Sequence, residues 1–355
     1  MQLLSDSRGL GFGGFLIGIG AGWIIFTNYS VDSNLFSWLL ILLGLSIIVS
    51  SILPHLLPDL RIGGLFSGLV IGMIVAIVIN TGFSILPWSN SYPYSEEGYK
   101  NFTDSVIADN ILFKTLNING QIHIESWEEN QYKVSAKVTA KGRTVSDAES
   151  NYNDVDIQLN DDLKSGVQEL ELEITIPQTL RNRINIDITV YVPSDSIMDV
   201  DVSTTNGGII LESINGGDFY LETTNGDLVF YDVTADIIDG DTTNGGIRGT
   251  TQSSDFYGKT TNGGISLTLP STESGSYNLR TTNGNVNVIV SQNAETGFDL
   301  DCSLSNGNLV FDLDDLSYTE QTSKSKDATT QNWDIASVQI EIDASTTNGN
   351  INIGN

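Results

Sequence analysis

Residues 204–247 read TTNGGIILESINGGDFYLETTNGDLVFYDVTADIIDGDTTNGGI, and this stretch shows the pattern that decides the fold. The phrase T-T-N-G recurs, and a degenerate S-N-G adds one copy, with asparagines at Asn206, Asn225, Asn244, Asn262, Asn283, Asn306 and Asn348. Their intervals are 19, 19, 18, 21, 23 and 42 residues. Because the last interval is twice 21, we expect one turn there whose corner phrase is lost. A period near 20 without helix-forming stretches indicates stacked β-strands.

Alignment on the asparagines shows apolar residues at fixed positions around each corner. In the unit of Asn225 these are Phe219 and Leu221 before the corner and Leu228 and Phe230 after it. This alternation predicts strand, corner, strand, with one apolar face per turn. Since no turn can bury that face alone, we expect an all-β solenoid of seven or eight turns, about 35–40 Å tall.

The Asn-Gly corner predicts two properties of the bend. A sharp turn between short strands favours residues that tolerate positive φ, as glycine and asparagine do. Stacked asparagine side chains can also hydrogen-bond from one turn to the next, as the ladders of cross-β structures do. The two threonines before each asparagine favour extended backbone and can stack in the same way.

The outer part of the chain divides into a cap, over 111–198, and the solenoid repeats, over 199–355. In the cap we expect strands around 116–127, 132–141, 168–176 and 184–192, and a short helix over 145–154. The polar stretch 318–333, which holds Lys324 and Lys326, is expected to interrupt the late repeats as a surface loop.

The first 87 residues contain three apolar runs, at about 10–27, 35–53 and 62–86, without an acidic or basic side chain. Each is long enough to cross a bilayer as a helix, so we predict a three-helix transmembrane anchor followed by a linker over 88–110. A cleaved signal peptide is the alternative for the first run. It fits poorly because Arg8 alone makes no strongly basic n-region, no A-x-A-like cleavage site follows the run, and two more apolar runs come after it.

The few charges near these runs predict their orientation. Arg8 and Arg61 flank the ends that the positive-inside rule places in the cytoplasm, so the N-terminus is expected inside and the C-terminal domain outside the cell. Glycines recur every fourth residue in the first and third runs, at Gly14, Gly18, Gly22, Gly64, Gly68 and Gly72. Such strips let helices approach closely, either within the anchor or between two chains in a helix–helix dimer.

Composition excludes several classes of function. The chain has 44 acidic and 16 basic side chains, a net charge of −28, which repels nucleic acid. The lone Cys302 excludes a disulfide scaffold and is expected as a small buried residue, with a reactive thiol as the alternative. His123 alternates with two isoleucines, so we expect a surface histidine rather than a metal ligand. No cofactor and no metal site are predicted.

The residues that could carry catalysis are scattered. Arg248, Lys259 and Arg280 are isolated bases, and carboxylate pairs such as Asp239 and Asp241 are common in so acidic a chain. We therefore predict no catalytic residues and no enzyme activity. Diffuse Ca²⁺ binding is an alternative for the clustered acids Asp312, Asp314 and Asp315. Tyr220 and Tyr257 are expected on the outer surface, where aromatic rings can stack on sugars.

Three stretches carry a family resemblance: NINGQIHIESW (117–127), INIDITVYVPSDSIMDVDVSTTNGGIIL (184–211) and the repeated T-T-N-G. They resemble the "putative adhesin" β-repeat domain of bacteria and archaea, from about Leu112 to the C-terminus. The glycine-rich apolar runs ahead of it resemble the Lia-type accessory proteins of envelope-stress signalling. The resemblance implies an extracytoplasmic β-solenoid and carries over no catalytic residue.

These observations predict a multi-pass cell-membrane protein whose solenoid is a non-catalytic, adhesin-like surface binding module. Its partners would be the lipid bilayer and a surface glycan or envelope protein. One alternative is an envelope-stress signalling accessory whose membrane helices contact a sensor kinase. A third is an enzyme on envelope polysaccharide. The acidic surface fits a cationic partner and a salty habitat equally well.

Overall fold

The computed structural model describes residues 12–21, 68–73, 75–76 and 92–355, which fall into two units, 1–91 and 92–355. In the first unit, 12–21, 68–73 and 75–76 are helical. A Cβ added at Gly18 would overlap the carbonyl oxygen of Leu69, and one at Gly72 would overlap that of Phe15. The two glycines therefore allow a close backbone approach within this unit, as expected for glycine strips on packed helices.

Among the described residues, no helix is both long and apolar enough to cross a membrane. The predicted spans 10–27 and 62–86 are described only in part, and the predicted span 35–53 lies outside the described residues.

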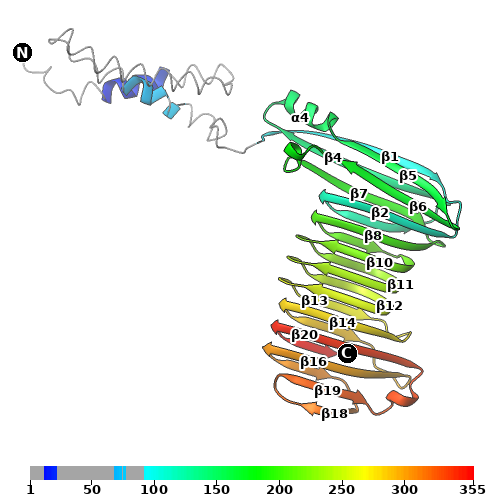
Figure 1. Ribbon diagram of the computed structural model, residues 1–355. Coiled ribbons are helices and arrows are strands. Elements are labelled where there is room, and N and C mark those ends of the chain that lie inside the picture. Colours follow the sequence, from blue (N-terminus) through cyan, green and yellow to red (C-terminus); the bar gives the residue numbers. More distant parts are fainter. Residues whose placement is uncertain (1–11, 22–67, 74, 77–91) are drawn as a thin grey trace, which may run out of the picture. The chain divides into compact units, whose positions relative to one another are not determined.

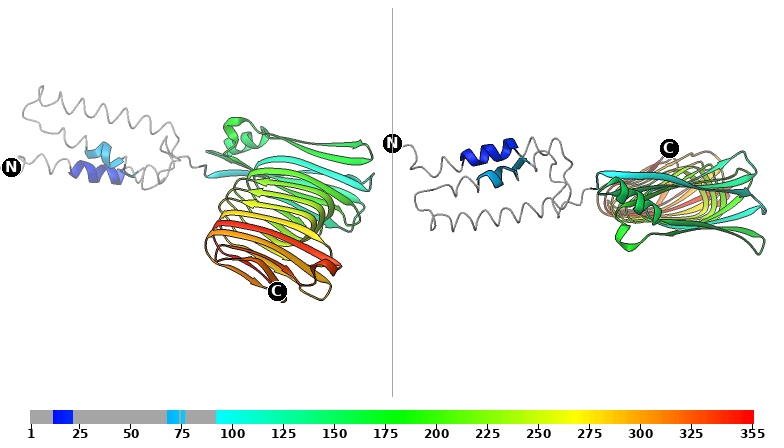
Figure 2. Two further views of the ribbon diagram at one scale, coloured as in Figure 1. Left: turned by 60° about the horizontal axis from the view of Figure 1, so that its bottom comes forward. Right: turned by 90° about the horizontal axis from the view of Figure 1, so that it is seen from above.

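The second unit is a stack of β-strands with two faces (Figures 1 and 2). Strands that precede the corner asparagines form the leading face, and strands that follow them form the trailing face. Across the leading face the order is β5 (Asp156–Lys164), β6 (Val167–Thr175), β2 (Asn110–Asn119), β8 (Ile197–Asn206), β10 (Asn215–Thr223), β11 (Leu228–Thr242), β12 (Ile247–Thr260), β14 (Gly275–Asn283), β20 (Val338–Asn348), β16 (Thr296–Asn306), β19 (Ser325–Thr330) and β18 (Leu316–Gln321).

The trailing face is built from shorter strands in the repeats and longer ones in the cap. Its order is β1 (Tyr94–Ser105), β4 (Gln131–Gly142), β7 (Ile184–Pro193), β3 (Ile122–Trp127), β9 (Ile209–Glu212), the first residues of β11 and β12, β13 (Ile265–Leu269), β15 (Val286–Val290), β21 (Ile351–Gly354) and β17 (Leu309–Asp312). The chain also forms α4 (Val145–Asn153) and short 3-10 turns at Gln178–Leu180 and Trp333–Ile335.

The apolar positions around each corner point into the space between the two faces. Phe219, Phe230 and Phe256 are fully buried there, and the Phe230 and Phe256 rings meet edge to face with centroids 5.8 Å apart. Phe256 in turn stacks on Tyr277 at 6.0 Å. The predicted stacked all-β architecture and its apolar face are therefore confirmed.

The predicted asparagine ladder is present and longer than the repeated phrase suggests. Each side-chain amide donates to the amide oxygen of the asparagine in the adjoining layer, at 2.7–2.9 Å, in the order Asn119, Asn206, Asn225, Asn244, Asn262, Asn283, Asn348 and Asn306. Asn119, in the phrase I-N-G, begins the ladder although it lies inside the predicted cap. The first coil is thus β2 and β3, and the cap and the repeats share one stack.

The reason for glycine at the corner differs from our expectation. Of the glycines that follow the ladder asparagines, only Gly120 and Gly307, at the two ends of the ladder, have positive φ. At the corners between them, a Cβ would overlap the glycine carbonyl oxygen of the adjoining layer, as at Gly226 with Gly207. Close stacking of backbone, rather than left-handed conformation, therefore requires glycine there.

The first threonine of each phrase points inward and completes the corner. Thr223 and Thr242 are buried, and each hydroxyl donates to the carbonyl oxygen of the corner glycine one layer back, at 2.8 Å. Thr260, Thr281 and Thr346 make the same bond at 2.8–2.9 Å. These buried corner hydroxyls are thus hydrogen-bonded, as burial of a polar group requires.

The last layers do not follow the order of the sequence. β20 and β21 pair in parallel with β14 and β15 on one side and with β16 and β17 on the other (Figure 1). The C-terminal coil therefore lies between two coils that precede it in the chain. The interval of 42 residues contains no degenerate turn, so that interpretation was wrong. The interval instead contains the end of the coil of β16 and β17, the hairpin of β18 and β19, and β20, which lies between β14 and β16.

Residues 318–333 form most of this hairpin rather than a surface loop. β18 and β19 are antiparallel, and β19 pairs with β16 and so extends the leading face. Lys326 Nζ donates to the carbonyl oxygen of Leu309 at 2.8 Å, and Lys324 Nζ donates to that of Gly307 at 3.3 Å. The two lysines thus cover carbonyls of the last coil, a common protection of a sheet edge.

At the opposite end of the stack (Figure 1) lies α4, which agrees with the helix expected over 145–154. Thr144 caps the helix by accepting a hydrogen bond from the Asp147 amide at 3.0 Å, and α4 packs against β4 and β1. Two strands were missed. β1 lies in the predicted linker 88–110, and β5 lies between the predicted strands of the cap.

Replacing Asn225 and Gly226 together by Ala is expected to lower the free energy of unfolding by on the order of 3–5 kcal/mol. Two ladder hydrogen bonds disappear, and the new Cβ meets the Gly207 carbonyl. Urea unfolding followed by circular dichroism measures the effect. Thr224→Ala, at the exposed neighbouring position, is the control and should unfold like the natural chain. An unchanged midpoint in the double variant would refute the corner interpretation.

A chain that stops at Ser337 should lose amide protection in both β14 and β16, because β20 pairs with each of them. Hydrogen exchange read by mass spectrometry checks this. A stack built in sequence order would instead lose protection only near its final coil. Natural protection of β14 in the shortened chain would therefore contradict the inserted coil.

Candidate functional site

The leading face carries a row of polar and aromatic side chains that we call the tyrosine row: Lys114, Asp201, Tyr220, Asp239 and Tyr257. They occupy one register position on β2, β8, β10, β11 and β12. Tyr220 and Tyr257 are 46% and 49% exposed, as the alternation with the buried phenylalanines predicted. The two rings project from alternate layers with a carboxylate between them.

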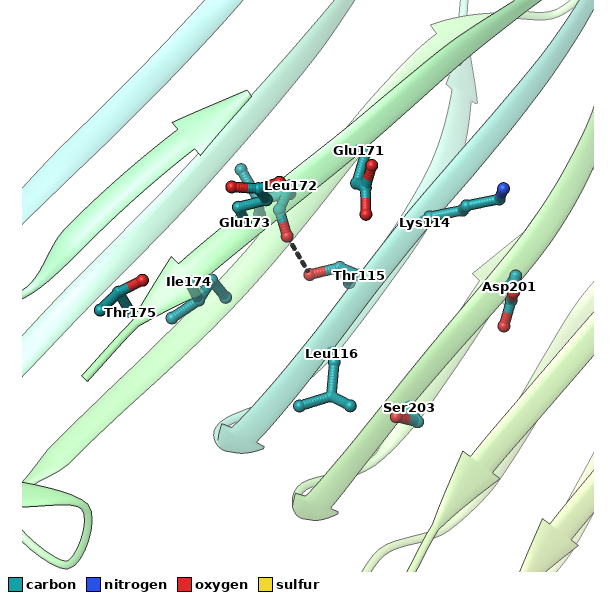
Figure 3. A pocket seen from close by; sticks show the side chains of 10 residues that line it. All are labelled: Lys114, Thr115, Leu116, Glu171, Leu172, Glu173, Ile174, Thr175, Asp201 and Ser203. Carbon is teal, nitrogen blue, oxygen red and sulfur yellow. Dashed lines mark hydrogen bonds between the residues drawn. The ribbon is translucent and has the colours of Figure 1, made fainter. Parts of the chain in front are cut away.

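At one end the tyrosine row runs into a groove of about 490 Å³ between β2 and β6 (Figure 3). The two strands pair only as far as Thr115 and Leu172, where the Thr115 hydroxyl donates to the Leu172 carbonyl at 3.0 Å. Beyond that point β2 continues along β8 alone, and the space beside it is lined by Leu116 and Ile174. The groove thus combines apolar side chains with the diverging ends of two strands.

The charge of the groove is negative. Lys114 lines it, but its ammonium group pairs with Glu169 at 2.7 Å. Hydrogen bonds from Lys114 and then from Lys164 lower the pKa of Glu169 to about 2. The remaining charged residues of the groove wall are acidic: Glu171, Glu173 and Asp201. The groove would therefore repel an anionic ligand. Its carboxylates can accept hydrogen bonds from hydroxyl groups and attract cations.

The bases considered for catalysis all stand in cross-layer ion pairs. Arg248 pairs with Asp227, Lys259 pairs with Asp241 at 3.0 Å, and Arg280 pairs with Asp343. Such pairs stabilise neighbouring layers modestly. Each of the three bases contacts a different carboxylate, so the three do not converge on one site. Asp241 is occupied by Lys259, so Asp239 and Asp241 do not form an isolated carboxylate pair.

Cys302 lies inside the core, opposite Ala344 of the inserted coil. Burial raises the pKa of its thiol to about 12. A buried, protonated thiol is a poor nucleophile, which agrees with the predicted structural role.

The acids Asp312, Asp314 and Asp315 are exposed and do not converge on one point. Within the described part of the chain, three metal-binding side chains come together at a single place, formed by His123, Glu125 and Glu212. His123 does point outward, as predicted. The sequence did not indicate Glu212 as its neighbour, because 89 residues separate the two.

The fold and its site residues can be set beside known proteins. Residues 113–255 match the Toastrack DUF4097 family. The Toastrack-like region begins in β2, covers the rest of the cap and ends in β12, so it includes the tyrosine row except for Tyr257. No curated protein is significantly similar to the chain in sequence.

Several solved structures are similar to about three quarters of this chain. One is a "putative cell adhesion protein" from Clostridium sporogenes, with 14% identity over 72% of this chain and 99% of that one, at a TM-score of 0.34. A "putative adhesin" from Bacteroides fragilis has 12% identity over 74% and 98%, at 0.36. A "putative lipid binding protein" from Parabacteroides distasonis has 12% identity over 72% and 96%, at 0.33.

Proposed function

We propose that the β-stack is a non-catalytic surface binding module that contacts an extended neutral glycan, or a surface protein, through the tyrosine row and the adjoining groove. Residues 1–87 would hold it to the cell membrane as a multi-pass anchor, with the N-terminus in the cytoplasm and the stack outside. The geometry of Tyr220 and Tyr257 carries this proposal.

Both tyrosines are held on a rigid surface. Parallel strands on either side fix the register of β10, β11 and β12, and Asp239 lies in register between the two tyrosines. Two layers separate the rings, a distance of about 10 Å along the stack. That spacing is comparable with the disaccharide unit of an extended β-linked polysaccharide, so every second sugar could stack on a ring.

The charge of the surface restricts the partner. Asp201 and Asp239 lie beside the rings, and acids line the groove at the end of the row. These carboxylates accept hydrogen bonds from sugar hydroxyls or from a basic protein surface and repel acidic polymers. A neutral glycan therefore fits the row better than an anionic one.

The anchor is supported by the composition of residues 1–87. The three apolar runs lack acidic and basic side chains, and the close approach at Gly18 and Gly72 is the kind that small residues permit between membrane helices. An exposed binding stack attached to such an anchor would present its side faces to the cell surroundings.

Tyr220→Ala combined with Tyr257→Ala should reduce retention on insoluble cell-wall polysaccharide at least tenfold, because each aromatic stack contributes on the order of 1 kcal/mol. Retention is measured by co-sedimentation of the full-length chain. Tyr231→Ala removes an exposed tyrosine from the trailing face and is the matched control. Equal retention of the double variant and the control would refute a role for the row.

The helix contact in the first unit favours a second function, that of an envelope-stress signalling accessory acting on a membrane sensor kinase. A simple anchor needs only apolar length. A regulator needs defined helix contacts, and the approaches of Gly18 to Leu69 and of Gly72 to Phe15 are of that kind. In this case the stack would sense the state of the envelope and the helices would transmit it.

Gly18→Leu should abolish recovery of a membrane kinase in cross-linking on intact cells if the chain is a regulator, because the side chain would separate the two helices. Gly20→Leu is the control, since a Cβ there meets no described atom within 4 Å. Recovery of a glycan or surface protein by both variants, without a kinase, would leave surface binding as the function.

A further inference from the structure

On the trailing face, β3 of the first coil and β9 of the second bring three metal-binding side chains together. The strands are parallel and in register, with His123 beside Ile210 and Glu125 beside Glu212. His123 Nε2 lies 3.1 Å from Glu212 Oε2. One ligand atom of each of His123, Glu125 and Glu212 lies within 4.8 Å of the others, and all three side chains are half-buried.

On the other side of β3, Tyr191 of β7 lies in register beside Glu125. The Lys133 ammonium lies over the Tyr191 ring, 5.5 Å from its centroid.

The two carboxylates are like charges on adjacent strands, an arrangement that destabilises a sheet. Elsewhere on the trailing face, Asp227 is balanced by Arg248 of the next layer. Across the described residues, Glu212 forms an ion pair with His123 alone, and Glu125 forms none. A divalent cation would supply the missing positive charge.

We propose that His123, Glu125 and Glu212 form a binding site for a divalent transition metal, with Zn²⁺ as the best fit. Zinc binds imidazole nitrogen and carboxylate oxygen at about 2.0–2.2 Å and often keeps an open position beside three protein ligands. An imidazole ligand favours zinc over Ca²⁺ and Mg²⁺, which prefer oxygen. Small rotations of the two flexible glutamates would close the remaining distances.

A metal here would do two things for the stack. It would link β3 of the first coil to β9 of the second coil, and these two strands are separated in the chain by most of the cap. It would also place a cation on a strongly acidic surface, with its open position facing solvent. The site is separate from the tyrosine row, which lies on the opposite face, so neither proposal depends on the other.

Titration of ZnCl₂ into the purified full-length chain by calorimetry tests the site. We expect one Zn²⁺ per chain, and at least tenfold weaker binding in His123→Gln and in Glu125→Gln. Glu222→Gln is the matched control, since Glu222 also lies in register beside a carboxylate, Asp241, but has no histidine next to it. The control should bind Zn²⁺ as the natural chain does. CaCl₂ should not compete at equal concentration.

The chain has two histidines, so a histidine-selective NMR spectrum of the ring nitrogens provides a second measurement. Zinc should shift the signal that disappears in His123→Gln. The circular dichroism of each variant shows whether the stack has folded, and Glu125→Gln keeps the histidine in place. Undiminished zinc binding in folded His123→Gln, or an equal loss in Glu222→Gln, would overturn the proposal.

Discussion

The close stacking of backbone at the Asn-Gly corners is the constraint on which the rest of the structure depends. Between the ends of the ladder, each corner glycine lies so near the glycine carbonyl of the adjoining layer that no side chain fits. The same proximity aligns the asparagine amides into one ladder and brings the buried threonine hydroxyls to the glycine carbonyls. The threonine, asparagine and glycine of the phrase T-T-N-G thus provide hydrogen-bond partners for the polar groups of the corner, which would be costly to bury without partners.

A stack held at its corners keeps equivalent residues of neighbouring layers in register. Inward positions then form one continuous core, and outward positions form straight rows on two faces. The tyrosine row and the cluster at His123 are both products of this geometry. In each case the proposed site arises between layers, so the chemistry of a row can change residue by residue while the corners and the core stay the same.

Local pattern was sufficient for much of the fold. The buried positions, the helix at 145–154 and the exposure of Tyr220 and Tyr257 follow from residues close in sequence, and the ladder follows from the repeat with a period near 20. Predictions failed where pairing is distant: the insertion of β20, the hairpin of β18 and β19, the strand β1 in the expected linker, and Asn119 as the first rung. The groove and the partner of His123 were missed for the same reason.

The sequence by itself determined which residues face the core, where the chain bends and that the surface is acidic, because alternation and corner chemistry act over a few residues. Only the tertiary structure decided the order of the layers and which outer side chains meet. A parallel strand can pair with either of two open edges, and the choice rests on the free energy of the whole stack, including the hairpin that covers its end. That quantity is a sum over distant contacts and is not visible in any single repeat.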